Sequence, residues 1–244
     1  MTAALLGAVL AGSLAQRATG MGLALVAAPF IVVALGPASG VLMVNLLGLV
    51  TSLLVLARVW ADVEWGTYWR LMPSSLLGVA AGALLAARLP ATWAQIVVGV
   101  VVLLALGVSS VVARTRSMPR TTGAVATAGG VSGLTSALAG IGGPPMAVLR
   151  TLTRWDHIGF AATLQPYFAT TGAVTVAAKV LADPGAWPDL AWSGWAAIAV
   201  AMIIGVGLGG TVTRRLPAAV LGRLITALAA LGSVWTVVDG VAAL

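Results

Sequence analysis

The chain has 244 residues, of which 60% are hydrophobic and only 8% are charged. A soluble domain carries about 25% charged residues, so this chain has too few polar side chains to cover a water-facing surface. The composition therefore excludes an ordinary soluble protein and predicts that lipid covers most of the surface. The net charge of +7 does not indicate a nucleic-acid partner, because the basic residues stand between apolar runs and serve orientation in a membrane. The lack of cysteine excludes disulfides and cysteine-bound metals.

Uncharged stretches follow one another along the whole chain. They cover residues 1–16, 18–57, 71–87, 89–113, 121–149, 158–178, 190–213 and 224–238. Most reach the roughly 20 residues that a membrane-spanning helix needs. A β-barrel would require alternating apolar and polar residues, whereas these runs are continuously apolar. We therefore predict an all-α, polytopic membrane protein with about eight hydrophobic segments.

The two halves of the chain resemble each other. A shift of 120 residues superimposes Gly20-Met21-Gly22 on Gly140-Ile141-Gly142 and Asn45 on Gln165. A shift of 127 superimposes Arg88-Leu89-Pro90 on Arg215-Leu216-Pro217, and the pair Gly78 and Gly82 on Gly205 and Gly209. This spacing predicts a duplication with a first repeat at 1–113, a basic cytoplasmic linker at 114–120 and a second repeat at 121–244.

Each repeat begins with a segment broken by glycine, at 2–35 and at 121–151. Three spans then follow in each repeat, at 39–58, 68–88 and 91–113, and at 157–180, 190–213 and 217–239. The arms of the first broken segment have about 14 residues, or roughly 21 Å of helix, which is short of a 30 Å hydrocarbon core. We therefore expect re-entrant hairpins, although about 30 residues in the second segment would also fit one tilted span.

The basic residues separate the two possible topologies. If each broken segment crosses the membrane, the repeats are parallel and the loop Lys and Arg residues divide six against six. If each segment returns to its own side, ten lie on one side and only Arg88 and Lys179 on the other. The positive-inside rule favours the second case. We therefore predict inverted repeats, both termini outside and arginine-rich loops in the cytoplasm of a multi-pass cell-membrane protein.

The glycine breaks are the candidate binding site. Glycine lets a ligand approach main-chain N–H groups, and each second arm begins at a break with its free N–H groups and positive dipole end. Two such ends meeting in the membrane would bind an anion. The backbone residues that we assign to this site are Gly20, Gly22, Gly140, Gly142 and Gly143.

Polar side chains near the breaks extend this site. Arg17 has no basic counterpart in the second repeat and would neutralise an anion, unless the first hairpin is shallow and the side chain reaches the surface. Asn45 and Gln165 would donate amide N–H groups, the alternative being contacts between helices. Thr19 is a weaker candidate, as are Ser136, Thr51 and Thr171.

The other motifs have structural explanations. The Gly78 and Gly205 pairs are typical of helix packing, and His157 is a lone histidine in a polar loop. Eight tryptophans near span ends predict an interfacial belt, at Trp60, Trp65, Trp69, Trp93, Trp155, Trp187, Trp192 and Trp195. No paired carboxylates, metal-ligand cluster or nucleophile with a base occurs inside the apolar runs, so we expect no catalytic residue, no metal and no cofactor.

These features resemble the sulfite exporter TauE/SafE family. The resemblance rests on Gln16-Arg17-Ala18-Thr19-Gly20-Met21-Gly22, on Leu25-Val26-Ala27-Ala28-Pro29 and on Ala139-Gly140-Ile141-Gly142-Gly143-Pro144-Pro145, and the span spacing extends it over nearly the whole chain. It implies transport of small sulfur-containing anions such as sulfite, sulfoacetate or other organosulfonates. The first motif departs from the family's fuller glycine run at Leu23 and Ala24.

Together these observations predict a secondary transporter of a small anion that works by alternating access. An anion channel lined by the same donors is the alternative, and a membrane enzyme or assembly subunit is disfavoured by the lack of catalytic groups. No carboxylate or histidine lies at mid-depth to carry protons, although carbonyls of the broken helices would suit sodium. The expected partners are the anionic substrate and the lipid bilayer, and a homodimer is compatible with the sequence.

Overall fold

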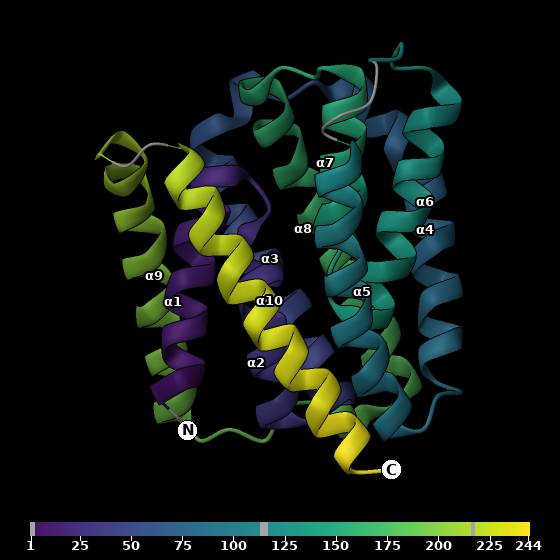
Figure 1. Cartoon of the computed structure of the whole chain (residues 1–244), viewed down its shortest axis with the longest axis vertical. Coiled ribbons are helices and arrows are strands. Elements are labelled where there is room, and N and C mark those ends of the chain that lie inside the picture. The colour runs from purple at the N-terminus through teal and green to yellow at the C-terminus, as the bar shows by residue number, and fades with distance from the viewer. Residues whose placement is uncertain (1–2, 113–116, 216–217) are drawn as a thin grey trace.

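The computed structural model describes residues 3–112, 117–215 and 218–244. Within these ranges the chain is entirely helical, as predicted (Figure 1). The α-helices are α1 (Ala3–Thr19), α2 (Gly22–Leu35), α3 (Pro37–Val59), α4 (Trp65–Ala86), α5 (Ala91–Val112), α6 (Thr122–Ala139), α7 (Gly143–Thr153), α8 (His157–Ala182), α9 (Trp192–Arg215) and α10 (Ala218–Ala242). Two short 3-10 helices, η1 (Trp60–Asp62) and η2 (Pro184–Ala186), precede α4 and α9. The linker residues 114–116 and the Leu216-Pro217 match lie outside the described residues.

Five of the described helices are long and apolar enough to cross a membrane. They lie at Pro37–Asp62, Trp65–Ala86, Ala91–Val108, Trp192–Thr211 and Arg223–Ala242. They carry large exposed apolar side chains such as Leu77, Leu104 and Leu231, which is the surface that lipid covers. The predicted span 157–180 forms α8 but does not belong to this group. Most of the central part of α8 is buried by other helices and holds polar residues, so it needs less apolar character.

Both segments that the sequence marks as broken are broken. Between α1 and α2 the chain turns at Gly20, with φ of 85°, and between α6 and α7 it turns at Gly140, with φ of 75°. Positive φ is the conformation that glycine adopts without steric cost. The arms then fold back, since a Cβ placed on Gly12 of α1 would lie 2.9 Å from the carbonyl oxygen of Leu23 in α2. The first segment is therefore a helical hairpin.

The two broken segments approach from opposite ends of the molecule. In Figure 1, α1 rises from the lower end and α2 returns to it, whereas α6 descends from the upper end and α7 returns upward. The beginning of α1 and the end of α10 both lie at the lower end.

Helices of the first half of the chain pack against helices of the second half. α1 packs on α9, α6 packs on α4, and α3 packs on α8 in the centre. The small-residue pairs make the first two contacts, because their missing side chains let the backbones touch. These contacts join Gly205 to Leu10 and Leu14, and Gly78 to Gly130 and Leu134. Gly130, which Gly78 contacts, lies 120 residues after Leu10, which Gly205 contacts. Leu134 likewise lies 120 residues after Leu14.

The tryptophans divide into two groups. Trp60, Trp69 and Trp192 are 59%, 65% and 89% exposed at the ends of helices, as an interfacial belt requires. Trp155 is only 5% exposed, and its Nε1 donates to Oε1 of Glu64 at 2.7 Å. The prediction that Trp155 is an interfacial anchor is therefore wrong. Its indole N–H is used instead to satisfy a carboxylate that also pairs with Arg120 at 2.9 Å.

Candidate functional site

The two breaks meet inside the helical bundle. A Cβ placed on Gly143, the first residue of α7, would lie 3.3 Å from Cβ and Sδ of Met21, which precedes α2. Gly20, Gly140, Gly142 and Gly143 are all buried. The amino ends of two half-helices from different repeats are thus in contact, and each brings the partial positive charge of a helix N-terminus.

Several backbone N–H groups at these two helix ends have no hydrogen-bond partner. The N-cap residues Met21 and Gly142 provide no side-chain cap, and the Gln16 amide accepts only from Leu23 in the first turn of α2. Pro144 and Pro145 carry no N–H, so the donors of α7 that face the break are those of Gly142 and Gly143. In the part of the chain that the structure describes, no hydrogen bond engages these two N–H groups or that of Gly22. Three free donors in a buried position are the elements of an anion site.

A small cavity lies at this junction. Its volume is about 30 Å³, which is about the space of one water molecule. No residue that lines it carries a charge, so nothing beside it cancels the positive ends of α2 and α7. The lining comes from both repeats and consists of Gln16, Met21, Leu23, Ala24, Val44, Asn45, Gly48, Ser136, Gly140, Gly142, Gly143, Phe168, Thr171 and Gly172.

Gln16 is the lining residue that sequence reasoning missed. Its Oε1 accepts from the N–H of Leu23 at 3.3 Å, and its Nε2 donates to Oγ of Ser52 at 3.3 Å. One N–H of this amide therefore remains unused. A signal was available, since Gln16 lies one turn before the break and is 3% exposed, but the adjacent Arg17 carries the more conspicuous charge.

Asn45 holds the second break in place. Its Nδ2 donates to the carbonyls of Val41 at 2.9 Å and Ser136 at 3.1 Å, and its Oδ1 accepts from Oγ of Ser136 at 2.9 Å. Asn45 lines the cavity, but both amide hydrogens are taken by carbonyl oxygens. As placed, it positions the end of α6 and has no donor left for an anion.

Gln165 holds the first break in the corresponding way. Its Nε2 donates to the carbonyls of Ala161 at 2.7 Å and Gly20 at 3.3 Å. Gln165 is 1% exposed and does not line the cavity. Like Asn45, it bridges from a central helix of one repeat to the break of the other.

The remaining predicted site residues lie around the first break. Thr19 donates to the carbonyl of Ala15 at 2.9 Å and accepts from the N–H of Met21 at 3.4 Å, so its hydroxyl shapes the turn. Gly22 packs too closely against Ala15 to carry a side chain. Arg17 is half-buried with its stem beside Gly209 of α9, and it does not line the cavity. The structure thus brings together the glycines, Asn45 and Gln16, with Arg17 on the adjacent α9 side.

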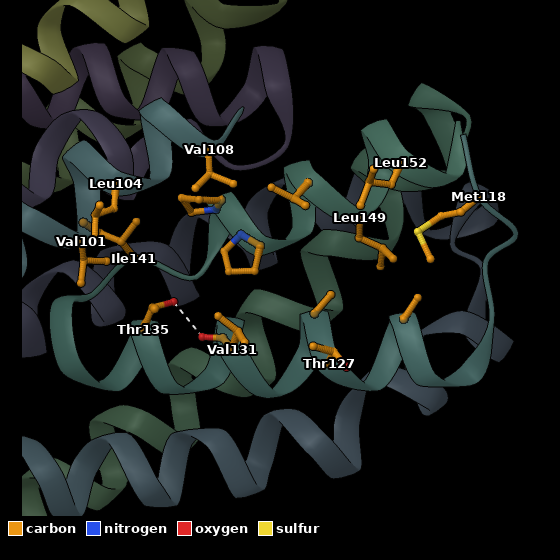
Figure 2. Close-up of a pocket in the computed structure, with 15 residues that line it drawn as sticks. Val101, Leu104, Val108, Met118, Thr127, Val131, Thr135, Ile141, Leu149 and Leu152 are labelled. Atoms are coloured by element: carbon orange, nitrogen blue, oxygen red, sulfur yellow. Dashed lines mark hydrogen bonds between the residues drawn. The ribbon is translucent and has the colours of Figure 1, made fainter. Parts of the chain in front are cut away.

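A larger groove between α5, α6 and α7 has a different character (Figure 2). Its volume is about 510 Å³, and its lining is almost entirely apolar, with Thr127 and Thr135 as the polar side chains. The Thr135 hydroxyl donates a hydrogen bond to the carbonyl of Val131 at 3.0 Å, which Figure 2 shows as a dashed line. This groove offers no group that would hold an anion, so the candidate site is the small cavity at the breaks.

Comparison with known proteins gives one match. A family model described as Sulfite exporter TauE/SafE matches residues 4–236, which is nearly the whole chain. No curated protein and no solved structure matches the chain.

Proposed function

This chain belongs to the sulfite exporter TauE/SafE family of membrane transporters of sulfur compounds, and we propose that it carries a small sulfur oxyanion or organosulfonate by alternating access. Sulfite and sulfoacetate are the substrates to test first. The anion binds where the amino ends of α2 and α7 meet. The observation that carries this proposal is the contact between two half-helix N-termini from different halves of the chain, at which the N–H groups of Gly22, Gly142 and Gly143 have no partner among the described residues.

The donors at the junction suit an oxyanion. The N–H groups of Gly22, Gly142 and Gly143 supply up to three hydrogen bonds, and the spare N–H of Gln16 supplies a fourth. A helix terminus carries about half a positive charge, so two of them repel each other when no anion is present. Arg17, which lies on the α9 side of the hairpin, adds longer-range attraction. Thr19, Gly20, Asn45, Gly140 and Gln165 keep the two breaks in position.

The size of the cavity supports a moving site. About 30 Å³ accommodates one water molecule, so a sulfur oxyanion enters only if the two hairpins move apart. Two hairpins that approach from opposite ends fit inverted repeats, whose exchange of conformations would open the site first to one side and then to the other. This motion distinguishes the proposed carrier from an anion channel.

The distribution of basic residues supports an orientation in the cell membrane. The connections that follow α3 and α7 and the one that precedes α6 lie at the upper end in Figure 1. Arg154 and Arg120 belong to these connections and Arg58 to the last turn of α3, so we assign this end to the cytoplasm. Both termini then face outward.

A pair of substitutions at Gly143 tests the proposed donors. Gly143→Pro removes one N–H at a helix position that tolerates proline, whereas Gly143→Ala keeps the N–H and adds a similar steric contact with Met21. A hydrogen bond to a charged group contributes about 1.5–3 kcal/mol, so the proline variant should bind sulfite roughly 10- to 150-fold more weakly than the alanine variant. The measurement is calorimetric titration of purified protein.

If the two variants bind sulfite with equal affinity, the N-terminus of α7 does not belong to the anion site. A transport assay in liposomes then distinguishes a carrier from a channel. A carrier shows saturable flux and counterflow of the labelled anion. Flux that rises linearly with concentration and shows no counterflow would favour the channel and contradict alternating access.

A further inference from the structure

The C-terminal end of α1 differs from the equivalent end of α6 in the hydrogen bonds that close its last turn. At the second break, the N–H of Gly140 bonds to the carbonyl of Ser136 at 2.8 Å and that of Ile141 to the carbonyl of Thr135 at 3.3 Å. This pattern caps the last turn of a helix. At the first break, the N–H of Gly20 donates to the carbonyl of Gln16, but the N–H of Met21 donates to the hydroxyl of Thr19. The carbonyl of Ala15, which is equivalent to that of Thr135, accepts from the Thr19 hydroxyl at 2.9 Å instead, so a side chain completes the last turn of α1.

Carbonyl oxygens without a partner lie at the ends of both helices. Among the described residues, no hydrogen bond reaches the carbonyl oxygens of Arg17 and Thr19, or those of the equivalent Ala137 and Ala139. These oxygens lie at the negative end of the helix dipole. In a low-dielectric interior, such a group is costly unless it finds a donor or a cation.

The side chain of Gln165 adds a second oxygen that has no partner. Both hydrogens of its amide are used, one of them on the carbonyl of Gly20 in this break. Its Oε1 is fully buried and accepts no hydrogen bond. The equivalent Oδ1 of Asn45 is satisfied by Ser136, whereas Gln16, which replaces Ser136 in the first repeat, bonds to Leu23 and Ser52 instead. One buried amide oxygen is thus left free at the first break and none at the equivalent position of the second.

We propose that the first break binds a sodium ion through Oε1 of Gln165 and the open carbonyls at the end of α1. An acceptor-only cluster of this kind cannot hold an oxyanion, since it has no hydrogen to donate. Its oxygens are neutral, and within the described residues no group of three acidic or histidine side chains forms elsewhere that would hold a divalent metal. Neutral oxygens suit a monovalent cation, and half-helix carboxyl ends are established ligands of coupling sodium ions.

This cation would be coupled to the proposed anion. The turn from Gly20 to Gly22 has the cation site on its carbonyl side and the proposed anion donors on its amide side. A cation that fixes this turn would raise anion affinity, and the anion would raise cation affinity by the same factor. The coupling rests on the proposed function, whereas sodium binding does not.

Thermal unfolding of the purified protein tests sodium binding without any sulfur anion. NaCl replaces choline chloride at constant chloride, so the anion environment stays fixed. A ligand at about ten times its Kd raises the Tm of a chain of this size by roughly 3–6 °C. We expect a saturable rise of this order in sodium, and little or none in KCl.

Two variants on α8 locate the site. Gln165→Leu should abolish the sodium-dependent rise, and Gln165→Glu should enlarge it by adding a negative charge. Thr175→Val is the matched control, because Thr175 is also fully buried on α8 with an unpartnered oxygen but lies ten residues away. The Thr175→Val variant should keep the sodium-dependent rise in Tm. The Glu variant gives an independent result if the Leu variant fails to fold.

Several results would overturn the proposal. These are no rise in sodium, an equal rise in potassium, an undiminished rise in Gln165→Leu, or a loss in Thr175→Val that matches it. Failure of sulfite binding with an intact sodium response would contradict the proposed anion site and leave the cation site standing.

Discussion

The amide of Gln16 shows how one side chain serves two purposes at the junction. Its oxygen accepts from the N–H of Leu23 and one hydrogen goes to Ser52, so the other hydrogen is available in the cavity. The neighbouring Arg17 has the charge that the sequence makes prominent, yet its stem packs toward α9. Position on the helix, and not the charge, decides which of the two reaches the cavity.

Gln16→Glu should weaken sulfite binding by about tenfold or more. The variant keeps the shape of the side chain and an acceptor for Leu23 but replaces the amide nitrogen with oxygen. When ionised it repels the anion, and when protonated its one O–H is used by Ser52, so in both states a donor to the anion is lost. Calorimetric titration of the purified variant gives the affinity.

Arg17→Gln provides the comparison at the next position. Because Arg17 does not line the cavity, we expect a smaller loss of affinity than in Gln16→Glu. A larger loss in Arg17→Gln would mean that the anion binds on the α9 side of the hairpin and that Gln16 is secondary.

At the scale of helices, close approach depends on glycine. A Cβ on Gly205 would lie 2.6 Å from the carbonyl oxygen of Leu10 and 2.8 Å from Cβ of Ser13. Two residues further along α9, a Cβ on Gly207 would meet nothing within 4 Å. The same helix therefore offers one glycine that packing requires and one that it does not.

Gly205→Ala should destabilise the protein and Gly207→Ala should not. Overpacking of a tight contact costs about 1–3 kcal/mol, whereas alanine in an open helical position is up to about 1 kcal/mol more favourable than glycine. Thermal unfolding in detergent should give a lower Tm for the first variant and an equal or higher Tm for the second. Equal values would show that α1 and α9 do not pack tightly in solution.

At the scale of the whole molecule, the two halves of the chain build a shared core. One buried cluster joins α1, α2 and α3 to α5, α9, α10 and the end of α6, and another joins α4 to α6, α7 and α8. Both clusters reach the breaks, since Leu138, Ala139 and Ile141 belong to the first and Met21 packs against the second. Opening of the proposed site would therefore shift side chains in both clusters.

The chain has no cysteine, so single cysteines report its orientation without background. Asp62 and Asp189 are exposed and lie near opposite ends of the molecule, before α4 and before α9. A membrane-impermeant thiol reagent should label Asp189→Cys in intact cells and Asp62→Cys only after permeabilisation. The reverse pattern would contradict the assignment of the arginine-rich end to the cytoplasm.

The sequence by itself determined the helical class and the two breaks, and it predicts a duplication. Apolar length requires membrane helices, glycine at positive φ permits the two turns, and the shifts of 120 and 127 residues mark which helices are equivalent. These features depend on local chemistry and period, which are visible in one dimension.

Only the tertiary structure decided which polar groups remain free. Asn45 and Gln165 each have two amide hydrogens, and the structure uses both. One bonds to a carbonyl one turn back on the same helix, that of Val41 or Ala161, and the other to a carbonyl from the opposite half of the chain, that of Ser136 or Gly20. Gln16 keeps one donor and Gln165 keeps one acceptor because their neighbours face elsewhere. A sequence supplies an inventory of donors and acceptors, and the packing of distant helices determines which of them are left for a ligand.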